Sequence, residues 1–138
     1  MAIANAASLP LAVDVESARP HEIKLLQKVI DACVLGCPPK KLTGDKAYDS
    51  DKMDEALAKQ GVELIAPHRE GRKRPPTQDG RALRRYRRRW SIERFWSWLQ
   101  RARRIVVRYE YYLENFKSFV LIACSIILMR RLPKLCHF

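Results

Sequence analysis

The sequence predicts an α/β fold in which helices pack on a small sheet and further helices follow toward the C-terminal end. Three observations predict it: β-prone runs at the start of the chain, helical periods alternating with further β-prone runs up to residue 66, and a long apolar run after residue 118. A chain of 138 residues has room for one domain with a modest core, so residues 1–138 are expected to form a single domain.

The first half of the chain alternates between strands and helices. The β-prone runs are residues 1–4, 9–15, 41–46 and 62–66. A small polar linker joins the first two runs, which predicts a hairpin. From residue 20, apolar residues recur at helical spacing until Gly36 and two prolines end the helix, and Ser50 is placed to N-cap a second helix. The resulting strand–helix–strand–helix–strand order is typical of a sheet covered by helices.

A basic stretch occupies the second half of the chain. The segment 67–80 carries two adjacent prolines and a cluster of charges, so it is expected to be a surface loop. It leads into residues 84–104, RRYRRRWSIERFWSWLQRARR, which contain one acid, Glu93. If this stretch forms a single helix, Tyr86, Arg89, Glu93 and Gln100 share one polar stripe on its surface. An apolar stripe lies beside that polar stripe.

The net charge of +12 favours a polyanionic partner. Nucleic acid is favoured over a membrane surface, which stays a weaker alternative. The apolar run 119–129 falls well short of the roughly 20 residues that a bilayer span needs, so residues 114–132 are expected to form a buried apolar helix and no membrane partner is expected.

Cysteine and histidine usage points to the cytoplasm. The four cysteines are scattered, and the three histidines do not lie at zinc-finger spacing beside them, so free thiols in a reducing compartment are expected. The first residues lack the basic region that precedes the apolar part of a signal peptide. A cytoplasmic location follows from both observations.

Two carboxylates are candidates for chemistry. Asp45 lies at the C-terminal end of a predicted strand and Glu93 lies on a later predicted helix, a placement in which two distant carboxylates can converge on one cation. Phosphoryl transfer on DNA uses Mg²⁺ held by such hard oxygen ligands. The alternatives are that Asp45 only caps a turn and that Glu93 only pairs with Arg89, four residues earlier.

These residues resemble a known family. The spacing Tyr86-x-x-Arg89-x-x-x-Glu93 is similar to the signature on the last catalytic helix of DDE transposases from bacterial insertion sequences. The segment GDKAYDS at residues 44–50 resembles the region around that family's second aspartate, and residues 108–132 resemble its closing helices. The resemblance extends over nearly the whole chain from about Leu9.

The resemblance implies an RNase H-like fold, a mixed five-stranded sheet with flanking helices, and a metal-dependent triad of two aspartates and one glutamate. Asp45 then matches the second aspartate and Glu93 the glutamate, while Tyr86 and Arg89 contact or orient the DNA end. Where the family usually has a lysine, seven positions after the glutamate, this chain has Gln100 with Arg101 beside it.

The front of the chain departs from the family. Residues 1–4 correspond to the second strand of the RNase H-like sheet, so the first strand, which lies between the second and fourth strands, is absent together with its aspartate. Asp14 and Glu16 lie on the wrong strand to replace it. The fold is therefore expected to be incomplete, with edges on the second and fourth strands that are open to pairing with another chain.

The function implied is DNA transposition by the C-terminal part of a DDE transposase, inactive alone. Mg²⁺ in a two-metal arrangement, or Mn²⁺, is expected only in a complete triad. Expected partners are transposon ends, target DNA, and a separately encoded N-terminal half or another transposase protomer, in the bacterial cytoplasm at the nucleoid. DNA contacts are expected from Tyr86, Arg89, Arg87, Arg88, Arg72, Lys73, Arg74, Gln100 and Arg101. The alternatives are a non-catalytic DNA-binding protein that uses residues 69–104 and an RNA-binding basic protein.

Overall fold

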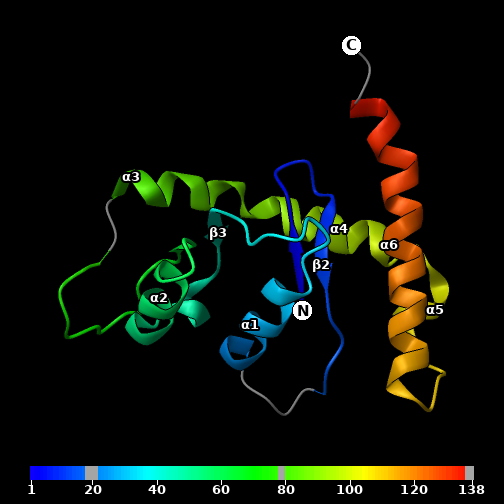
Figure 1. The fold of residues 1–138 in the computed structure, drawn as a ribbon, viewed down its shortest axis with the longest axis horizontal. Helices are drawn as coiled ribbons and strands as arrows, with labels where there is room; N and C mark the ends of the chain where they lie inside the picture. The colour runs from blue at the N-terminus through cyan, green and yellow to red at the C-terminus, as the bar shows by residue number, and fades with distance from the viewer. Residues whose placement is uncertain (18–21, 78–79, 136–138) are drawn as a thin grey trace.

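Short strands form two separate sheets in a computed structural model that describes residues 1–17, 22–77 and 80–135 (Figure 1). One sheet is antiparallel and pairs β1 (Ala2–Ala4) with β2 (Pro10–Val13). The other is parallel and pairs β3 (Lys41–Thr43) with β4 (Glu63–Ile65). The expected strands are therefore present, but within these ranges they do not join into one sheet.

The β1–β2 hairpin confirms the pattern of the first fifteen residues. The side-chain oxygen of Asn5 accepts hydrogen bonds from the backbone N–H groups of Ala7 and Leu9, both at 2.9 Å, and so closes the turn. Ser8 takes the left-handed conformation, with φ of 65°. Pro10 stands first in its strand, where the missing N–H does least harm.

Helices connect and cover these strands. Between β2 and β4 the chain forms α1 (Glu22–Asp31), the 3-10 helix η1 (Lys46–Tyr48) and α2 (Asp51–Ala58). Ser50 occupies the N-cap of α2, although its side chain makes no capping hydrogen bond. Past the end of α2, Gly61 has φ of 75° and the Val62 N–H bonds back to the Leu57 carbonyl at 3.0 Å. This turn brings β4 alongside β3, as a parallel pair requires.

The arginine-rich stretch forms a rod along the upper side of the molecule (Figure 1). It consists of α3 (Gly80–Leu83), the 3-10 helix η2 (Arg84–Arg89) and α4 (Trp90–Leu99), and a separate turn, α5 (Arg103–Val106), follows. The expected single α-helix over residues 84–104 is therefore wrong. A 3-10 helix brings residues i and i+3 into line, so Tyr86 and Arg89 still share a side, whereas Gln100 lies beyond the end of α4.

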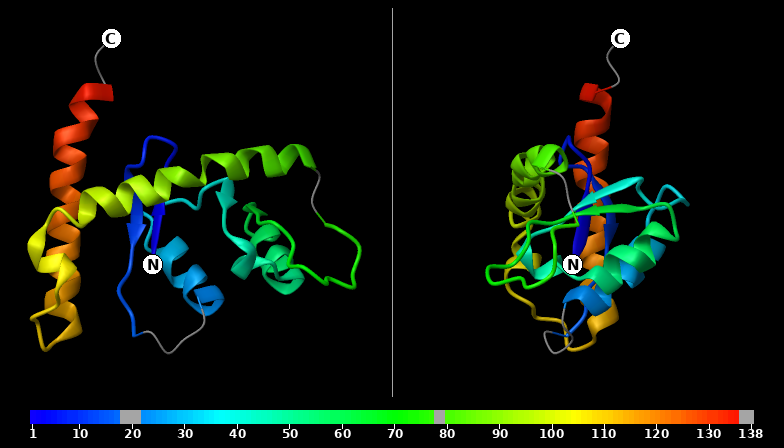
Figure 2. Two further views of the ribbon diagram at one scale, coloured as in Figure 1. Left: turned by 180° about the vertical axis from the view of Figure 1, so that it is seen from behind. Right: turned by 90° about the vertical axis from the view of Figure 1, so that its left-hand side faces the viewer.

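Two apolar cores lie on opposite faces of the hairpin. On one face, Ile3 and Ala12 pack with α1, α2 and β4. On the other face, Val13 packs with Phe95 and Leu99 of α4 and with the last helix, α6 (Leu113–Leu135). The view from behind in Figure 2 (left) shows the hairpin between α1 and α6. The buried side chains of α4 pack against the hairpin, and α4 is part of the rod. The hairpin therefore helps to fix the position of the rod and its arginines.

The expectation of a buried apolar helix at residues 114–132 holds on one face of α6 only. Val120, Ala123, Cys124 and Ile127 are buried there. Leu121, Ile122, Ile126 and Met129 are exposed on the opposite face. An apolar run on every side of a helix predicts burial, but here the body of the protein covers only one side. Among the described residues, no helix is long and apolar enough to cross a membrane.

Candidate active site and nucleic-acid interface

Asp45 lies just after β3, which ends at Thr43 and is shorter than the predicted strand at residues 41–46. One of its carboxylate oxygens accepts a hydrogen bond from the Ala47 N–H at 2.8 Å, so Asp45 caps η1. The preceding glycine serves the same turn: a Cβ on Gly44 would lie 2.9 Å from the ring of Tyr48. The motif GDKAYDS thus places a half-buried carboxylate at the end of β3, held by a turn that packs Tyr48 against Gly44.

Tyr86, Arg89 and Glu93 touch one another in series. The guanidinium of Arg89 lies 5.5 Å from the centre of the Tyr86 ring and forms an ion pair with Glu93 at 3.0 Å. This is the i, i+4 pair that was the alternative interpretation of Glu93. Both partners are exposed, so the pair contributes about 0.3–0.5 kcal/mol and does not prevent Glu93 from taking another partner.

A cavity of about 810 Å³ links the two halves of the candidate site. Asp45 lines it from the end of β3, and Arg85 and Arg89 line it from η2. Glu93 is not among its lining residues, and it reaches the cavity only through its ion pair with Arg89. The structure thus brings Asp45 and Arg89 to one cavity and leaves Glu93 at its margin.

Asp45 and Glu93 are donors of the type that Mg²⁺ prefers, because both offer hard carboxylate oxygens. Across the described ranges, however, no group of three or more His, Cys, Asp or Glu side chains is placed to hold a metal ion. In the described ranges the two carboxylates are thus candidate donors without a group of three ligands around them.

Several of the expected DNA contacts are exposed along the rod and just beyond it. Arg87, Arg89, Gln100 and Arg101 all present exposed side chains, as does Lys73 in the preceding loop. The side chain of Arg88 lies outside what the structure describes. Arginine side chains also stack on the tryptophans: Arg94 lies 4.1 Å from the ring centre of Trp90.

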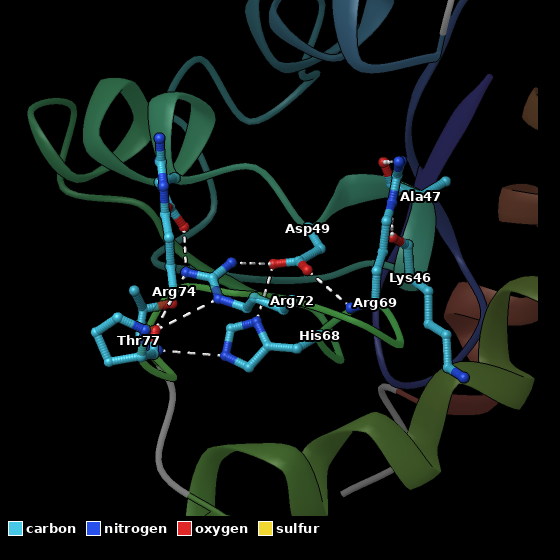
Figure 3. A network of polar contacts seen from close by, with 10 residues as sticks. Lys46, Ala47, Asp49, His68, Arg69, Arg72, Arg74 and Thr77 are labelled. Carbon is cyan, nitrogen blue, oxygen red and sulfur yellow. Dashed lines mark hydrogen bonds and ion pairs between the residues drawn. The ribbon is translucent and has the colours of Figure 1, made fainter.

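Arg72 and Arg74 both bond acidic side chains of the protein (Figure 3), although the Arg74 side chain remains 75% exposed. Arg72 bonds Asp49 at 2.8 Å and also bonds Asp51, and its side chain is only 13% exposed. Arg74 bonds the other oxygen of Asp51 at 2.8 Å. A phosphate could reach Arg72 only by displacing these carboxylates, so the structure does not favour it as a DNA contact.

Asp49 is the centre of this network, and sequence reasoning did not single it out. It accepts hydrogen bonds from the Arg69 N–H at 2.8 Å and from Arg72, and His68 lies 2.9 Å from it. Burial acts to raise the pKa of Asp49, but these hydrogen bonds and the Arg72 charge outweigh burial and lower it. The sequence gives little indication of this network, because Asp49 and its partners lie about twenty residues apart on separate segments.

Comparison with known proteins agrees with the predicted resemblance. The chain is 29% identical over 133 residues to a Burkholderia cepacia protein named "Putative transposase for insertion sequence element IS402". That match covers 91% of this chain and 59% of the relative, so the chain spans less than two thirds of that protein. No solved structure matches the chain. The family described as "Transposase DDE domain" matches residues 1–128, and the chain therefore belongs to the DDE transposase family.

Proposed function

We propose that residues 1–138 are part of a DDE transposase catalytic domain, an incomplete RNase H-like unit that acts in DNA transposition. One observation carries the proposal: Asp45 and Arg89 line one cavity while Arg89 bonds Glu93, so the elements bearing the two carboxylates meet at one place. Exposed arginines continue along the rod from that place. A strong positive charge beside acidic residues suits a site that must bind a phosphodiester and also act on it.

In the complete enzyme, Asp45 and Glu93 would hold the metal together with a carboxylate from outside these residues. When bound, Mg²⁺ in a two-metal arrangement, or Mn²⁺, neutralises charge on the phosphate and activates the attacking oxygen. Tyr86 and Arg89 orient the DNA end, and Arg87, Arg101, Lys73 and the side chain of Arg88 bind phosphates of the transposon end or target. Gln100 takes the place of a lysine contact to the terminal phosphate. This work would be done in the bacterial cytoplasm, on the nucleoid.

The DNA-binding part of the proposal can be tested by charge reversal. The double variant Arg87→Glu, Arg88→Glu should weaken binding to duplex oligonucleotides and lower the slope of log affinity against log salt by about 0.9 for each phosphate that is no longer neutralised. Lys52→Glu, Lys59→Glu is the matched control, because it changes the net charge equally on exposed positions of α2 or at its end. Equal losses of affinity in both double variants would show that only the overall charge matters.

The catalytic part needs a separate assay. Residues 1–138 alone should not nick supercoiled DNA in Mg²⁺ or Mn²⁺, because the described residues offer no complete set of metal ligands. Robust nicking that Glu93→Gln abolishes would overturn this expectation.

A second candidate function is a non-catalytic DNA-binding protein. This alternative is favoured because both carboxylates already have partners within the protein. Asp45 accepts a hydrogen bond from the Ala47 N–H, and Glu93 forms an ion pair with Arg89. The two candidates differ in their metal response. Calorimetric titration of Mg²⁺ or Mn²⁺ into the protein–DNA complex, with the transposase portion that supplies the further carboxylate also present, should produce heat that Asp45→Asn removes if the carboxylates serve catalysis, and no such heat if they are only structural.

A further inference from the structure

The connection between α5 and α6 exposes three tyrosines. This tyrosine segment, residues 106–112 (VVRYEYY), runs from the last residue of α5 to the residue before α6 and lies at the lower end of α6 in Figure 1. Tyr109 is 74% exposed, Tyr111 is 88% exposed and Tyr112 is 65% exposed. Large apolar groups that are exposed next to one another commonly belong to an interaction site.

Ion pairs and hydrogen bonds hold the tyrosine segment in its shape. The Glu110 side chain is only 7% exposed and forms an ion pair with Arg104 at 3.1 Å. The Arg108 guanidinium donates hydrogen bonds to the backbone carbonyl of Glu110 at 2.9 Å and to that of Tyr111 at 2.8 Å. The rings of Tyr111 and Tyr112 meet edge to face, with their centres 5.1 Å apart. The exposed rings therefore belong to an ordered turn, and a ligand that binds them pays little conformational entropy.

The charge around these rings is mainly positive. The side chains of Arg101, Arg103 and Arg108 are exposed. The hydrogen-bond acceptors of Arg108 are neutral carbonyls, so they leave its positive charge uncompensated. One exposed acid, Glu114, lies close by in the first turn of α6, where it suits the helix dipole. A surface of this composition fits a negatively charged ligand that also has flat apolar groups.

Unpaired nucleotides have both of these properties. A base outside a duplex has free faces that stack on aromatic rings, while arginines neutralise the phosphates of its strand. Inside a duplex each base is already stacked between its neighbours, so exposed tyrosine rings find no free face there. The tyrosine segment thus suits single strands better than duplexes, whereas the arginines alone would suit both.

We propose that the tyrosine segment binds unpaired nucleotides of DNA, with bases stacked on Tyr109 and Tyr111 and phosphates held by Arg103 and Arg108. The choice of DNA over RNA rests on the proposed function. The segment gives the protein a preference for frayed or single-stranded DNA over closed duplex, which the arginines of the rod do not supply.

Fluorescence anisotropy of the 138-residue protein with labelled oligonucleotides tests the proposal. One probe is a strand of thymidine nucleotides, which does not pair with itself. The other is a strand of equal length made of abasic deoxyribose units, which carries the same phosphates but no bases. The thymidine strand should bind about tenfold more tightly or better, because only this strand can stack on the rings.

Three double variants locate the stacking. Tyr109→Ala, Tyr111→Ala should reduce the affinity for the thymidine strand to that for the abasic strand, and it should leave the affinities for the abasic strand and for duplex DNA unchanged. Tyr109→Phe, Tyr111→Phe keeps the rings and should keep the preference. Val34→Ala, Leu35→Ala is the matched control, because it also removes exposed apolar side chains, and it should keep the preference as well. If the alanine variant does not fold, the comparison of the two strands in the unchanged protein still decides.

Several results would overturn the proposal. Equal affinity of the unchanged protein for the thymidine and abasic strands would exclude base stacking. An equal loss of affinity for duplex DNA and the thymidine strand in the alanine variant would show a general structural effect. Tighter binding of a uridine ribonucleotide strand would assign the surface to RNA. Weaker self-association of the alanine variant, with unchanged affinity for the thymidine strand, would assign the surface to a protein partner.

Failure of this proposal is distinct from failure of the proposed function. The proposed DNA binding fails if Arg87→Glu, Arg88→Glu leaves the affinity for duplex DNA unchanged. Base stacking on the tyrosine segment is measured instead by the difference between two strands of equal charge, so either result can be obtained without the other.

Discussion

Asp14 is a buried carboxylate held between two helices. Its side chain is 4% exposed, and it forms ion pairs with Lys28 of α1 at 3.1 Å and Lys117 of α6 at 2.6 Å. Both lysines are partly exposed, with side-chain exposures of 55% and 39%, so losing these pairs costs less than losing a fully buried pair. Asp14→Asn should therefore lower the free energy of unfolding at pH 7 by about 1–2 kcal/mol, measured by urea denaturation. Asp31→Asn, an exposed change on α1, should have little effect.

The loss of stability in Asp14→Asn depends on pH, and the pKa of Asp14 determines the direction of that dependence. Burial acts to raise the pKa of Asp14, but hydrogen bonds and charge from Lys117 and Lys28 outweigh burial, so the pKa is lowered on folding. A lowered folded-state pKa stabilises the protein above the unfolded value of about 3.9, and this contribution is lost as pH falls through the folded value. The difference between Asp14→Asn and the unchanged protein should shrink below about pH 4. A constant difference down to pH 2 would contradict the assignment.

At the residue scale, sequence spacing predicted contacts between residues of one helical stretch better than contacts between residues that are far apart in the sequence. Tyr86, Arg89 and Glu93 meet because they are three and four residues apart, which any helical form brings together. Arg72 was expected to face DNA but bonds Asp49, 23 residues away in sequence. Composition could not reveal this pairing, because it depends on how η1, α2 and the loop after β4 come together.

At the scale of elements, the basic loop after β4 is tied to the protein by its own charges. The Arg69 N–H bonds Asp49 at 2.8 Å, and the Thr77 N–H lies 3.2 Å from the Nε2 atom of His68 (Figure 3). Arg72→Gln removes the charge that pairs with Asp49 and Asp51, so exchange of the Arg69 and Thr77 amides should accelerate by about tenfold.

Lys73→Gln is the matched control for that prediction. Its side chain is exposed, and the substitution removes the same charge from the neighbouring position. Equal acceleration in both variants would mean that net charge, rather than the Arg72 ion pairs, orders the loop. Unchanged exchange in Arg72→Gln would mean that the remaining contacts are sufficient.

The elements of the first half were predictable because each has its own local signal. Asn5 closes the hairpin turn through its side-chain oxygen, and Gly61 takes the positive φ that glycine favours past the end of α2. The rod was less predictable. Over six residues, Arg84–Arg89, an apolar pattern cannot separate a 3-10 helix from an α-helix, since both place i and i+3 on one side.

At the scale of the whole molecule, the strand order was predictable in part. The family resemblance implies that a strand is missing from the middle of the sheet, and this stays a prediction. In the described residues the strands form two sheets that border one cavity. The burial of the last helix was predicted wrongly on one face. Helical periodicity identifies which residues share a face, but the number of faces covered depends on how many elements are available to pack there.

The uncovered face of α6 predicts how the whole protein behaves in solution. Leu121, Ile122, Ile126 and Met129 lie within an arc of roughly 140°, which makes an apolar stripe that only the exposed Ser125 interrupts within that arc. Such a stripe promotes self-association, so sedimentation velocity should show species larger than a monomer as concentration rises. Ile122→Lys should shift that onset to a concentration several-fold higher, because it places a charge in the middle of the stripe. Ala56→Lys adds the same charge to an exposed position of α2, away from the stripe, and should leave the onset unchanged. Equal shifts in both variants would show that net charge, and not this apolar face, governs association.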